Sequence, residues 1–414
     1  MLRFLVGFAL PCLLTSVVAA EDWPQWLGPN RDNHANIVLQ PWQGPLAVAW
    51  RVPVGEGHGR PIVADGKVFL HYKPRTEEKE EVLCLELNSG KELWRQSYER
   101  TRFTNQFGNG PRSTPLYHQG TLYTLGVTGL LTAWNANNGQ RLWQVDLLNH
   151  FKAKNLFFGI ATSPLILDQQ LIVMVGGSGC CLIALDPNTG AILKQTGDDA
   201  ASYSSPMVCR FGPKASQLVL LTAAGVRGFE TPALTSPWFV PFKDQLNESS
   251  STPIWFQDRL IVSSVTAGML AIDYAKAAGP PTAEPKVSWK NPALSCYFGT
   301  PVGFANHLYV VTGSLPPFAS ANLHCVDPQT GKVQWTQKKV GTYHATLLAT
   351  QKHLLLLEEE GALVLVQPDP KEYRELCRSN VCRHTWAHPA LADGYLLVRD
   401  EQELLAVRLP TGSR

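Results

Sequence analysis

The chain has 414 residues, of which 44% are hydrophobic and 17% charged, with 33 glycines and 30 prolines. This composition excludes disorder and favours many short strands joined by tight turns over long surface helices. The formal net charge is +2 and no long block of like charges occurs. The chain therefore lacks the concentrated basic surface that nucleic-acid binding requires.

Residues 1–20 have the pattern of a secretory signal peptide. Arg3 gives a positive start, an apolar stretch follows, and small residues precede Glu21. The alternative is a membrane anchor, but Pro11 interrupts the stretch, which is short for a bilayer. We expect cleavage after Ala20, a periplasmic or secreted mature protein, and no transmembrane segment after cleavage. Cys12 follows Leu10 and Pro11 instead of a small residue, which argues against a lipoprotein.

Residues 21–47 form an N-terminal extension without the repeat described next. Its tryptophans, Trp23, Trp26 and Trp42, suggest two readings: exposed platforms for a sugar ligand, or side chains packed against the rest of the protein.

From residue 48 to residue 414 the chain repeats a unit of two apolar runs around a turn, and such a period decides the fold. Asp65-Gly66 and Asp393-Gly394 are hairpin turn signals within two of these units. The units begin at intervals of 42 to 54 residues, at Pro61, Pro115, Pro164, Pro206, Pro253, Pro301, Ala345 and Pro389.

The clearest units continue with a third strand, a glycine turn and a tryptophan. The tryptophan comes ten residues after a small residue of the third strand, as in Cys325-Val-Asp-Pro-Gln-Thr-Gly-Lys-Val-Gln-Trp335. The tryptophan offers an apolar plate between neighbouring units and the glycine permits a sharp turn. We interpret these residues as structural: Trp50, Trp94, Trp143, Trp238, Trp289, Trp335, Gly90, Gly139, Gly190 and Gly331.

Four strands per unit and eight units predict an all-β, eight-bladed β-propeller built from four-stranded antiparallel blades. The last unit ends before its fourth strand, whereas an unpaired strand containing Trp50 precedes the first unit. The N-terminal strand should therefore complete the last blade and remove exposed edges.

Eight cysteines remain after cleavage, in a compartment that permits disulfides. Cys377 and Cys382 are close enough in sequence to staple one loop, but pairing stays open. Cys84 and Cys325 fall at buried strand positions. The adjacent pair Cys180-Cys181 lies in an apolar strand, where plain packing is the ordinary interpretation.

The spacing Ala-x-Asp-x-x-Thr-Gly-x-x-x-Trp resembles the tryptophan-docking repeat of PQQ-like propellers (PQQ, pyrroloquinoline quinone), and residues 325–335 differ from it only at the first position. The resemblance covers nearly all of residues 48–412. The opening Asp22-Trp-Pro-Gln-Trp-Leu-Gly-Pro-Asn-Arg31 is similar to secreted members from planctomycete-type bacteria. The whole is also similar to the propeller of the outer-membrane assembly factor BamB, which implies a non-catalytic scaffold without cofactor that binds an envelope protein partner.

The resemblance also implies an alternative, a PQQ-dependent quinoprotein dehydrogenase with PQQ and calcium in the channel. Cys180 and Cys181 would then hold PQQ as an adjacent disulfide. The chain is short for such an enzyme, and its calcium-ligating side chains have no recognisable counterpart here. A carbohydrate-binding propeller is a third hypothesis.

Ligand binding in a propeller favours loops at the channel mouth. Polar and aromatic residues precede several innermost strands, and together they suit an anionic or carbonyl-bearing group. These candidate binding residues are His58, Arg60, Arg112, Tyr203, His344 and His388. We predict no catalytic residue and no metal ligand.

Overall fold

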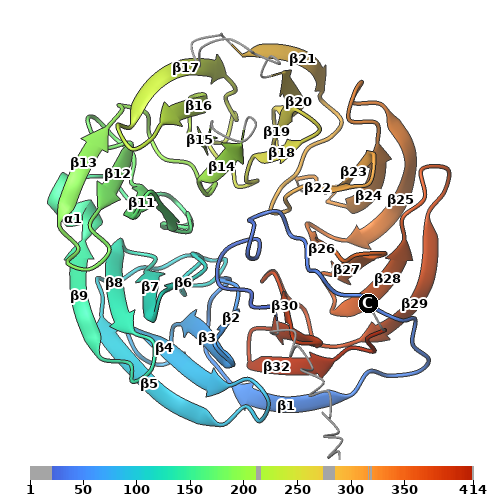
Figure 1. Cartoon of the computed structure of the whole chain (residues 1–414), viewed down its shortest axis with the longest axis horizontal. Helices are drawn as coiled ribbons and strands as arrows, with labels where there is room; N and C mark the ends of the chain where they lie inside the picture. The colour runs from blue at the N-terminus through green and yellow to red at the C-terminus, as the bar shows by residue number, and fades with distance from the viewer. Residues whose placement is uncertain (1–20, 211–215, 274–284, 316, 318, 413–414) are drawn as a thin grey trace, which may run out of the picture.

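The computed structural model describes residues 21–210, 216–273, 285–315, 317 and 319–412. Within them the chain forms a ring of eight four-stranded antiparallel sheets (Figure 1). The predicted eight-bladed propeller is confirmed. The predicted signal peptide, residues 1–20, lies outside the described residues. No helix in the described part of the chain is long and apolar enough to cross a membrane.

The strands of each blade are given from the channel outward. Blade 1 contains β2 (Ile62–Ala64), β3 (Lys67–Tyr72), β4 (Lys79–Glu86) and β5 (Glu92–Glu99). Blade 2 contains β6 (Leu116–His118), β7 (Thr121–Leu125), β8 (Leu130–Asn135) and β9 (Arg141–Asp146). Blade 3 contains β10 (Leu165–Leu167), β11 (Gln170–Met174), β12 (Leu182–Leu185) and β13 (Ile192–Thr196). Blade 4 contains β14 (Met207–Arg210), β15 (Ser216–Leu221), β16 (Gly225–Glu230) and β17 (Thr235–Pro241).

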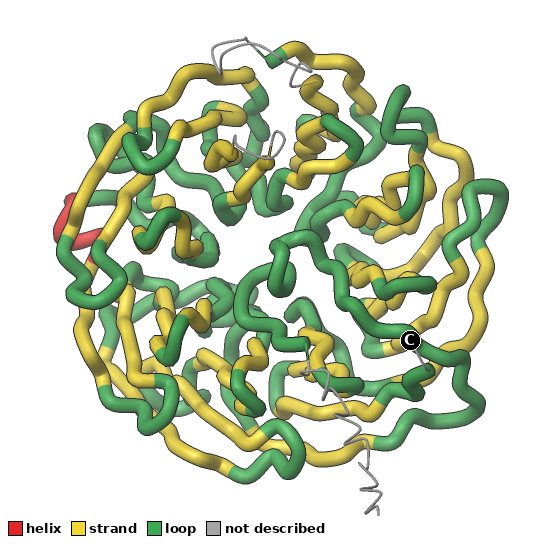
Figure 2. Tube along the Cα trace, viewed as in Figure 1, coloured by secondary structure: helices red, strands yellow, loops and turns green. Residues whose placement is uncertain are grey.

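The second half of the ring repeats this order. Blade 5 contains β18 (Ile254–Phe256), β19 (Arg259–Ser264), β20 (Gly268–Asp273) and β21 (Lys286–Asn291). Blade 6 contains β22 (Val302–Phe304), β23 (His307–Thr312), β24 (Ala321–Val326) and β25 (Val333–Gly341). Blade 7 contains β26 (Ala345–Ala349), β27 (Leu354–Glu358), β28 (Ala362–Gln367) and β29 (Arg374–Asn380). Blade 8 contains β30 (Ala390–Ala392), β31 (Tyr395–Arg399), β32 (Glu403–Arg408) and β1 (Val48–Pro53). A single-turn helix, α1 (Leu147–Phe151), follows β9 at the outer rim (Figure 2).

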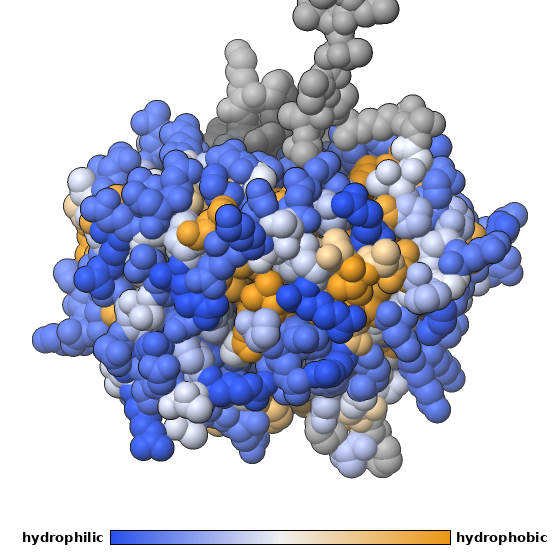
Figure 3. All heavy atoms as spheres, turned by 90° about the horizontal axis from the view of Figure 1, so that it is seen from below, coloured by the Kyte–Doolittle hydropathy of each residue, from blue (hydrophilic) through white to orange (hydrophobic). Residues whose placement is uncertain are grey.

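Burial explains why the inner strands are nearly continuously apolar. In β28 five consecutive residues are buried, since both faces of the sheet are covered by neighbouring blades. In the outer strand β17, exposed residues alternate with buried Trp238 and Val240, because one face meets solvent. The side of the ring is accordingly mostly hydrophilic with smaller apolar patches (Figure 3).

The ring closes as predicted. Strand β1 pairs with β32 in antiparallel register, with Trp50 opposite Ala406. The first and last segments of the propeller therefore share one sheet, and blade 8 has the same four strands as the others.

Most of the tryptophans expected to be structural bridge adjacent blades. Each outer-strand indole donates a hydrogen bond to a turn carbonyl of the next blade, and several lie against the turn glycine. The bonds join Trp50 to Leu87, Trp94 to Ala136, Trp143 to Pro187, Trp289 to Pro328 and Trp335 to Asp369, at 2.7–3.1 Å. The glycines in contact are Gly90, Gly139, Gly190 and Gly331.

In blades 3 and 4 the hydrogen bond at the tryptophan position differs from this pattern. In blade 3 Lys194 takes the tryptophan position, opposite Ala184, and its ammonium donates to the Pro232 carbonyl of blade 4 at 2.7 Å. In blade 4 the Trp238 indole donates to Gln217 Oε1 of its own sheet at 2.8 Å. A cation therefore replaces an indole as the donor at one seam.

At the seam between blades 7 and 8 the N-terminal extension replaces the tryptophan. Cys377 occupies the tryptophan position, opposite Leu365. The extension passes over this seam: the Trp42 backbone N–H contacts Cys377 Sγ at 3.4 Å, and the Gly412 N–H donates to the Val38 carbonyl at 2.9 Å. Buried Trp42 packs in the same apolar cluster as blade 8.

The rest of the extension crosses the central channel (Figure 1). Trp23 pairs with Val63 of β2 in blade 1, and His34 bridges to Ala349 of β26 in blade 7, on the far side of blade 8. The Arg31 guanidinium donates to the Pro164 carbonyl of blade 3 at 3.1 Å. The segment thus ties together several blades inside the ring. Trp23 has no exposed surface, so it is a packed residue and not a surface platform for sugar.

Candidate functional site

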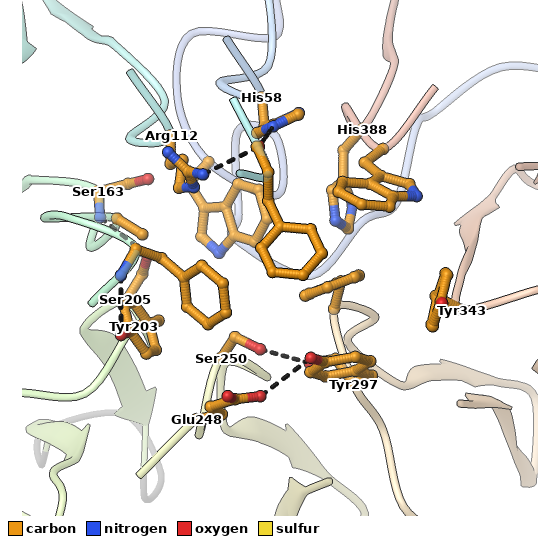
Figure 4. A pocket seen from close by; sticks show the side chains of 16 residues that line it. His58, Arg112, Ser163, Tyr203, Ser205, Glu248, Ser250, Tyr297, Tyr343 and His388 are labelled. Atoms are coloured by element: carbon orange, nitrogen blue, oxygen red, sulfur yellow. Dashed lines mark hydrogen bonds between the residues drawn. The ribbon is translucent and has the colours of Figure 1, made fainter. Parts of the chain in front are cut away.

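A pocket lies at the channel mouth where the loops preceding the innermost strands converge (Figure 4). About 1090 Å³ of space, part of it open to solvent, lies between its lining residues. Its lining consists of Trp26, His58, Phe107, Arg112, Phe158, Ala161, Ser163, Tyr203, Ser205, Glu248, Ser250, Tyr297, Phe298, Tyr343, Trp386 and His388.

The floor of the pocket is built by the N-terminal extension. The Trp26 indole donates to Thr252 Oγ1 at 2.9 Å and lies 4.8 Å from the His388 ring. The Arg60 guanidinium lies 5.1 Å from the Trp26 ring and is fully buried. The extension therefore gives the channel mouth a floor.

Hydrogen bonds join the heads of several neighbouring inner strands. The residue at the head of each inner strand is serine or threonine in blades 2 to 6. In three of these blades its backbone N–H donates to the equivalent hydroxyl of the next blade: from Thr114 to Ser163 at 3.0 Å, from Ser163 to Ser205 at 2.9 Å and from Thr252 to Thr300 at 3.2 Å. Blades 7, 8 and 1 carry His344, His388 and Arg60 at this position. These larger side chains lie on the side where the extension fills the channel.

Aromatic side chains form the walls. The Tyr297 and Phe298 rings stack at 4.0 Å, and Phe298 lies 5.7 Å from Trp386. Across the pocket Phe158 lies 5.4 Å from Tyr203 and 5.7 Å from Phe107. Rings contributed by several blades thus surround one space, an arrangement that suits ligands with flat apolar or cationic faces.

Arg112 is held by the protein itself. Its guanidinium donates to the carbonyls of Gly110, Phe107 and Gly108 at 3.1–3.3 Å. It also lies 5.9 Å from the Phe158 ring. Burial lowers the pKa of Arg112 to about 10, so the side chain remains a cation at neutral pH.

The three histidines predicted for the site are neutral at neutral pH. Burial lowers the pKa of His58 to about 3 and that of His344 to about 4. Burial, aided by His344 and Arg60, also holds the pKa of His388 well below its usual range. The His58 Nε2 lies 2.8 Å from the Phe107 carbonyl, so it carries the proton.

Glu248 is the single carboxylate among the lining residues. It precedes β18 and accepts a hydrogen bond from the Tyr297 hydroxyl at 2.9 Å. Burial raises its pKa, and the nearby Asp244 carboxylate adds to the shift.

The structure brings together four of the six predicted binding residues: His58, Arg112, Tyr203 and His388 line the pocket. Arg60 and His344 are buried behind the lining, where Arg60 contacts Asn33 and His344 contacts Thr346. Sequence reasoning missed Glu248 and most of the aromatic wall. A signal existed, because Phe298 and Trp386 each lie three residues before the proline of an inner-strand unit, as His58, Arg112 and Tyr203 do.

The matched family is described as outer membrane protein assembly factor BamB, and its model matches residues 78–337, more than half of the chain. The chain belongs to this family. A search of curated proteins gave no match to this BamB-family chain.

Solved structures similar to this BamB-family chain show the same fold. BamB from Moraxella catarrhalis shares 15% identity with a TM-score of 0.63, covering 90% of this chain and 100% of that one. The quinohemoprotein alcohol dehydrogenase ADHIIG from Pseudomonas putida HK5 shares 13% identity with a TM-score of 0.67, covering 95% and 81%. A europium-containing methanol dehydrogenase shares 13% identity with a TM-score of 0.62, covering 93% and 89%.

The lining residues do not fit PQQ with calcium. Calcium takes six to eight oxygen ligands, often from several carboxylates, whereas the lining offers one carboxylate, Glu248, already bonded to Tyr297. The described residues contain no group of three His, Cys, Asp or Glu arranged to hold a metal. Cys180 and Cys181 are buried free thiols and lie outside the pocket lining. The other described cysteines, Cys377 and Cys382 among them, are also free thiols.

Proposed function

We propose that this chain is an exported, non-catalytic binding protein of the cell envelope, and that it captures a compact ligand in the pocket at the channel mouth. One observation carries the proposal: a cup with aromatic walls, whose floor is supplied by the chain's own N-terminal extension. Such a concave, largely apolar site is the usual form of a small-molecule site.

The polar groups of the lining support binding over catalysis. The Ser163 and Ser205 hydroxyls accept hydrogen bonds from backbone N–H groups, and His58 is bonded to a backbone carbonyl. Nucleophilic catalysis requires a hydroxyl paired with a general base. In the described lining no serine is hydrogen-bonded to a histidine or to Glu248.

The proposal is tested by recovering the ligand. The mature chain, from residue 21, is incubated with a low-molecular-weight fraction of envelope extract and examined by native mass spectrometry. We expect a bound small molecule that is lost in Trp386→Ala and Phe298→Ala. It should be retained in Leu142→Ala, a control on the outer strand β9 with 48% exposure.

Three results would contradict this proposal: no retained molecule, retention that ignores the pocket substitutions, or a molecule that is turned over. Saturable, dye-linked alcohol oxidation after addition of PQQ and calcium would establish the dehydrogenase alternative instead. Retention of only an envelope protein, with the pocket variants unaffected, would favour a BamB-like protein scaffold that does not use the pocket.

A further inference from the structure

The charge at one side of the pocket is not neutralised by the protein. Glu248 lies with Ser250 and Tyr297 on the wall supplied by the loops before β18 and β22 (Figure 4). No described cation forms an ion pair with its carboxylate, and the charged group that acts on it is Asp244, a second carboxylate. Asp244 is itself buried and is held by the backbone and hydroxyl of Thr266. This wall therefore carries uncompensated negative charge.

The arginines at the pocket use their hydrogen-bond donors on the protein itself, although Arg112 remains a cation in the lining. Arg112 is occupied by three backbone carbonyls of its own loop. Arg60 is buried behind Trp26 and donates to Asn33 Oδ1 at 3.0 Å. The sequence-based expectation of an anionic ligand relied on these two arginines and on three histidines. The histidines are neutral at neutral pH, so they add no positive charge. The anchor for an anion is thus much weaker than the sequence suggested.

Aromatic rings flank the negative wall. Tyr297 carries the hydroxyl that bonds Glu248 and stacks on Phe298 at 4.0 Å. Phe158 and Tyr203 form a second pair at 5.4 Å on the neighbouring side. The faces of aromatic rings carry negative potential, which adds to the field of a carboxylate.

We infer that the pocket binds a compact organic cation, with an ammonium group against Glu248 and the aromatic rings of Phe158, Tyr203, Tyr297 and Phe298. This inference rests on the proposed function and specifies the ligand class. Recognition of ammonium groups by aromatic faces needs no hydrogen-bond donors from the protein, and the lining supplies few free ones.

The test compares ligands of equal shape and different charge. Choline and its uncharged carbon isostere, 3,3-dimethylbutan-1-ol, are titrated into the mature chain, with binding followed by calorimetry and by the fluorescence of Trp26 and Trp386. Tetramethylammonium, phenyltrimethylammonium, benzoate and a methyl glucoside complete the panel. We expect the best cation to bind about tenfold or more tightly than its uncharged counterpart.

Substitution of the carboxylate separates charge from shape. Glu248→Gln should remove most of the preference for the cation and leave the weak binding of the isostere unchanged. The matched control is Glu372→Gln, at an exposed glutamate outside the pocket, which should bind like the parent chain.

Acidification gives a second readout. Since the pKa of Glu248 is raised, chiefly by burial, its charge is lost at a higher pH than for an ordinary glutamate. The facing groups keep their charge states, because the pKa of Asp244 is lowered by hydrogen bonds and those of Tyr203 and Tyr297 are raised by burial. Cation affinity should therefore fall on acidification at a higher pH than the titration of an ordinary glutamate would give, and Glu248→Gln should abolish this dependence.

Equal binding of choline and its isostere, preference for benzoate or the glucoside, or unchanged cation binding in Glu248→Gln would overturn the inference. In each of these cases a pocket ligand remains and the proposed function stands. If no panel compound binds and native mass spectrometry recovers no molecule, both the inference and the proposed function fail.

Discussion

Buried histidines at the channel mouth should make the fold sensitive to acid. His344 is 2% exposed, and burial places its pKa at about 4, below the ordinary value of 6.5. The unfolded chain therefore binds a proton at a higher pH than the folded chain. Stability is fully present above about pH 6.5 and falls as the pH drops toward 4, by up to about 3 kcal/mol for this residue.

His344→Gln should flatten that pH dependence, because an amide cannot titrate and still reaches Thr346. Urea unfolding of the parent and the variant at pH 7 and at about pH 4.5 measures the difference. His150→Gln, an exposed histidine on α1, is the control and should follow the parent. Parallel curves for His344→Gln and the parent would show that this histidine does not titrate on unfolding.

At the scale of the structural element, the contact between an outer-strand tryptophan and the next blade depends on a glycine. A Cβ at Gly90 would lie 2.6 Å from the Trp50 ring, whereas a Cβ at Gly44 would have open space. Both glycines have positive φ, +69° and +72°, so an alanine is similarly strained at either position.

Gly44→Ala should therefore cost about 1 kcal/mol and Gly90→Ala about 3 kcal/mol, the excess reporting displacement of Trp50. Urea midpoints of the two variants provide the comparison. Equal losses would mean that blade 8 does not depend on close packing of Trp50 against the turn of blade 1.

The N-terminal extension also contributes to the stability of the fold. Trp23 has no exposed surface, exchanges backbone hydrogen bonds with Val63 at 2.9 and 3.0 Å, and lies under the Arg60 guanidinium. Trp23→Ala should cost about 3–5 kcal/mol and loosen the pocket floor, because the cavity cannot be filled by rigid neighbours.

Thermal and urea unfolding measure the loss at Trp23. Phe157→Ala is the matched aromatic control, since that ring is 66% exposed and its removal should change stability by less than about 0.5 kcal/mol. If Trp23→Ala lowers the free energy of unfolding no more than Phe157→Ala does, the N-terminal extension does not stabilise the fold through Trp23.

At the scale of the whole molecule, one strand closes the circle. Without residues 48–53, β32 would present an unpaired edge and blades 8 and 1 would lose the Trp50 contact. Because such edges recruit other chains, a variant that begins after residue 53 should aggregate in size-exclusion chromatography with light scattering. A monomeric variant with unchanged unfolding behaviour would show that closure is dispensable.

Removal of that strand also removes the extension, so a second variant isolates closure. Trp50→Ala keeps the extension and the strand and removes only the indole that bonds to the Leu87 carbonyl. It should remain monomeric but unfold at lower urea concentration, by about 3–5 kcal/mol.

The sequence by itself determined the number of blades, the position of the glycine turns and the closure by the N-terminal strand. Each of these follows from local patterns: apolar runs that need two covered faces, and a tryptophan at fixed spacing from a turn. The sequence also placed four pocket residues, because every loop that precedes an inner strand must reach the same mouth.

Only the tertiary structure decided what fills the channel and what lines the pocket. The extension has no repeat, so nothing local indicates that Trp26 forms a floor or that Trp42 replaces the missing tryptophan near Cys377. The pairing of Glu248 with Tyr297, and the occupation of Arg112 by backbone carbonyls, depend on contacts between loops that only the closed ring brings together. Charge and burial at the site are therefore properties of the assembled ring, which a linear pattern of residues does not contain.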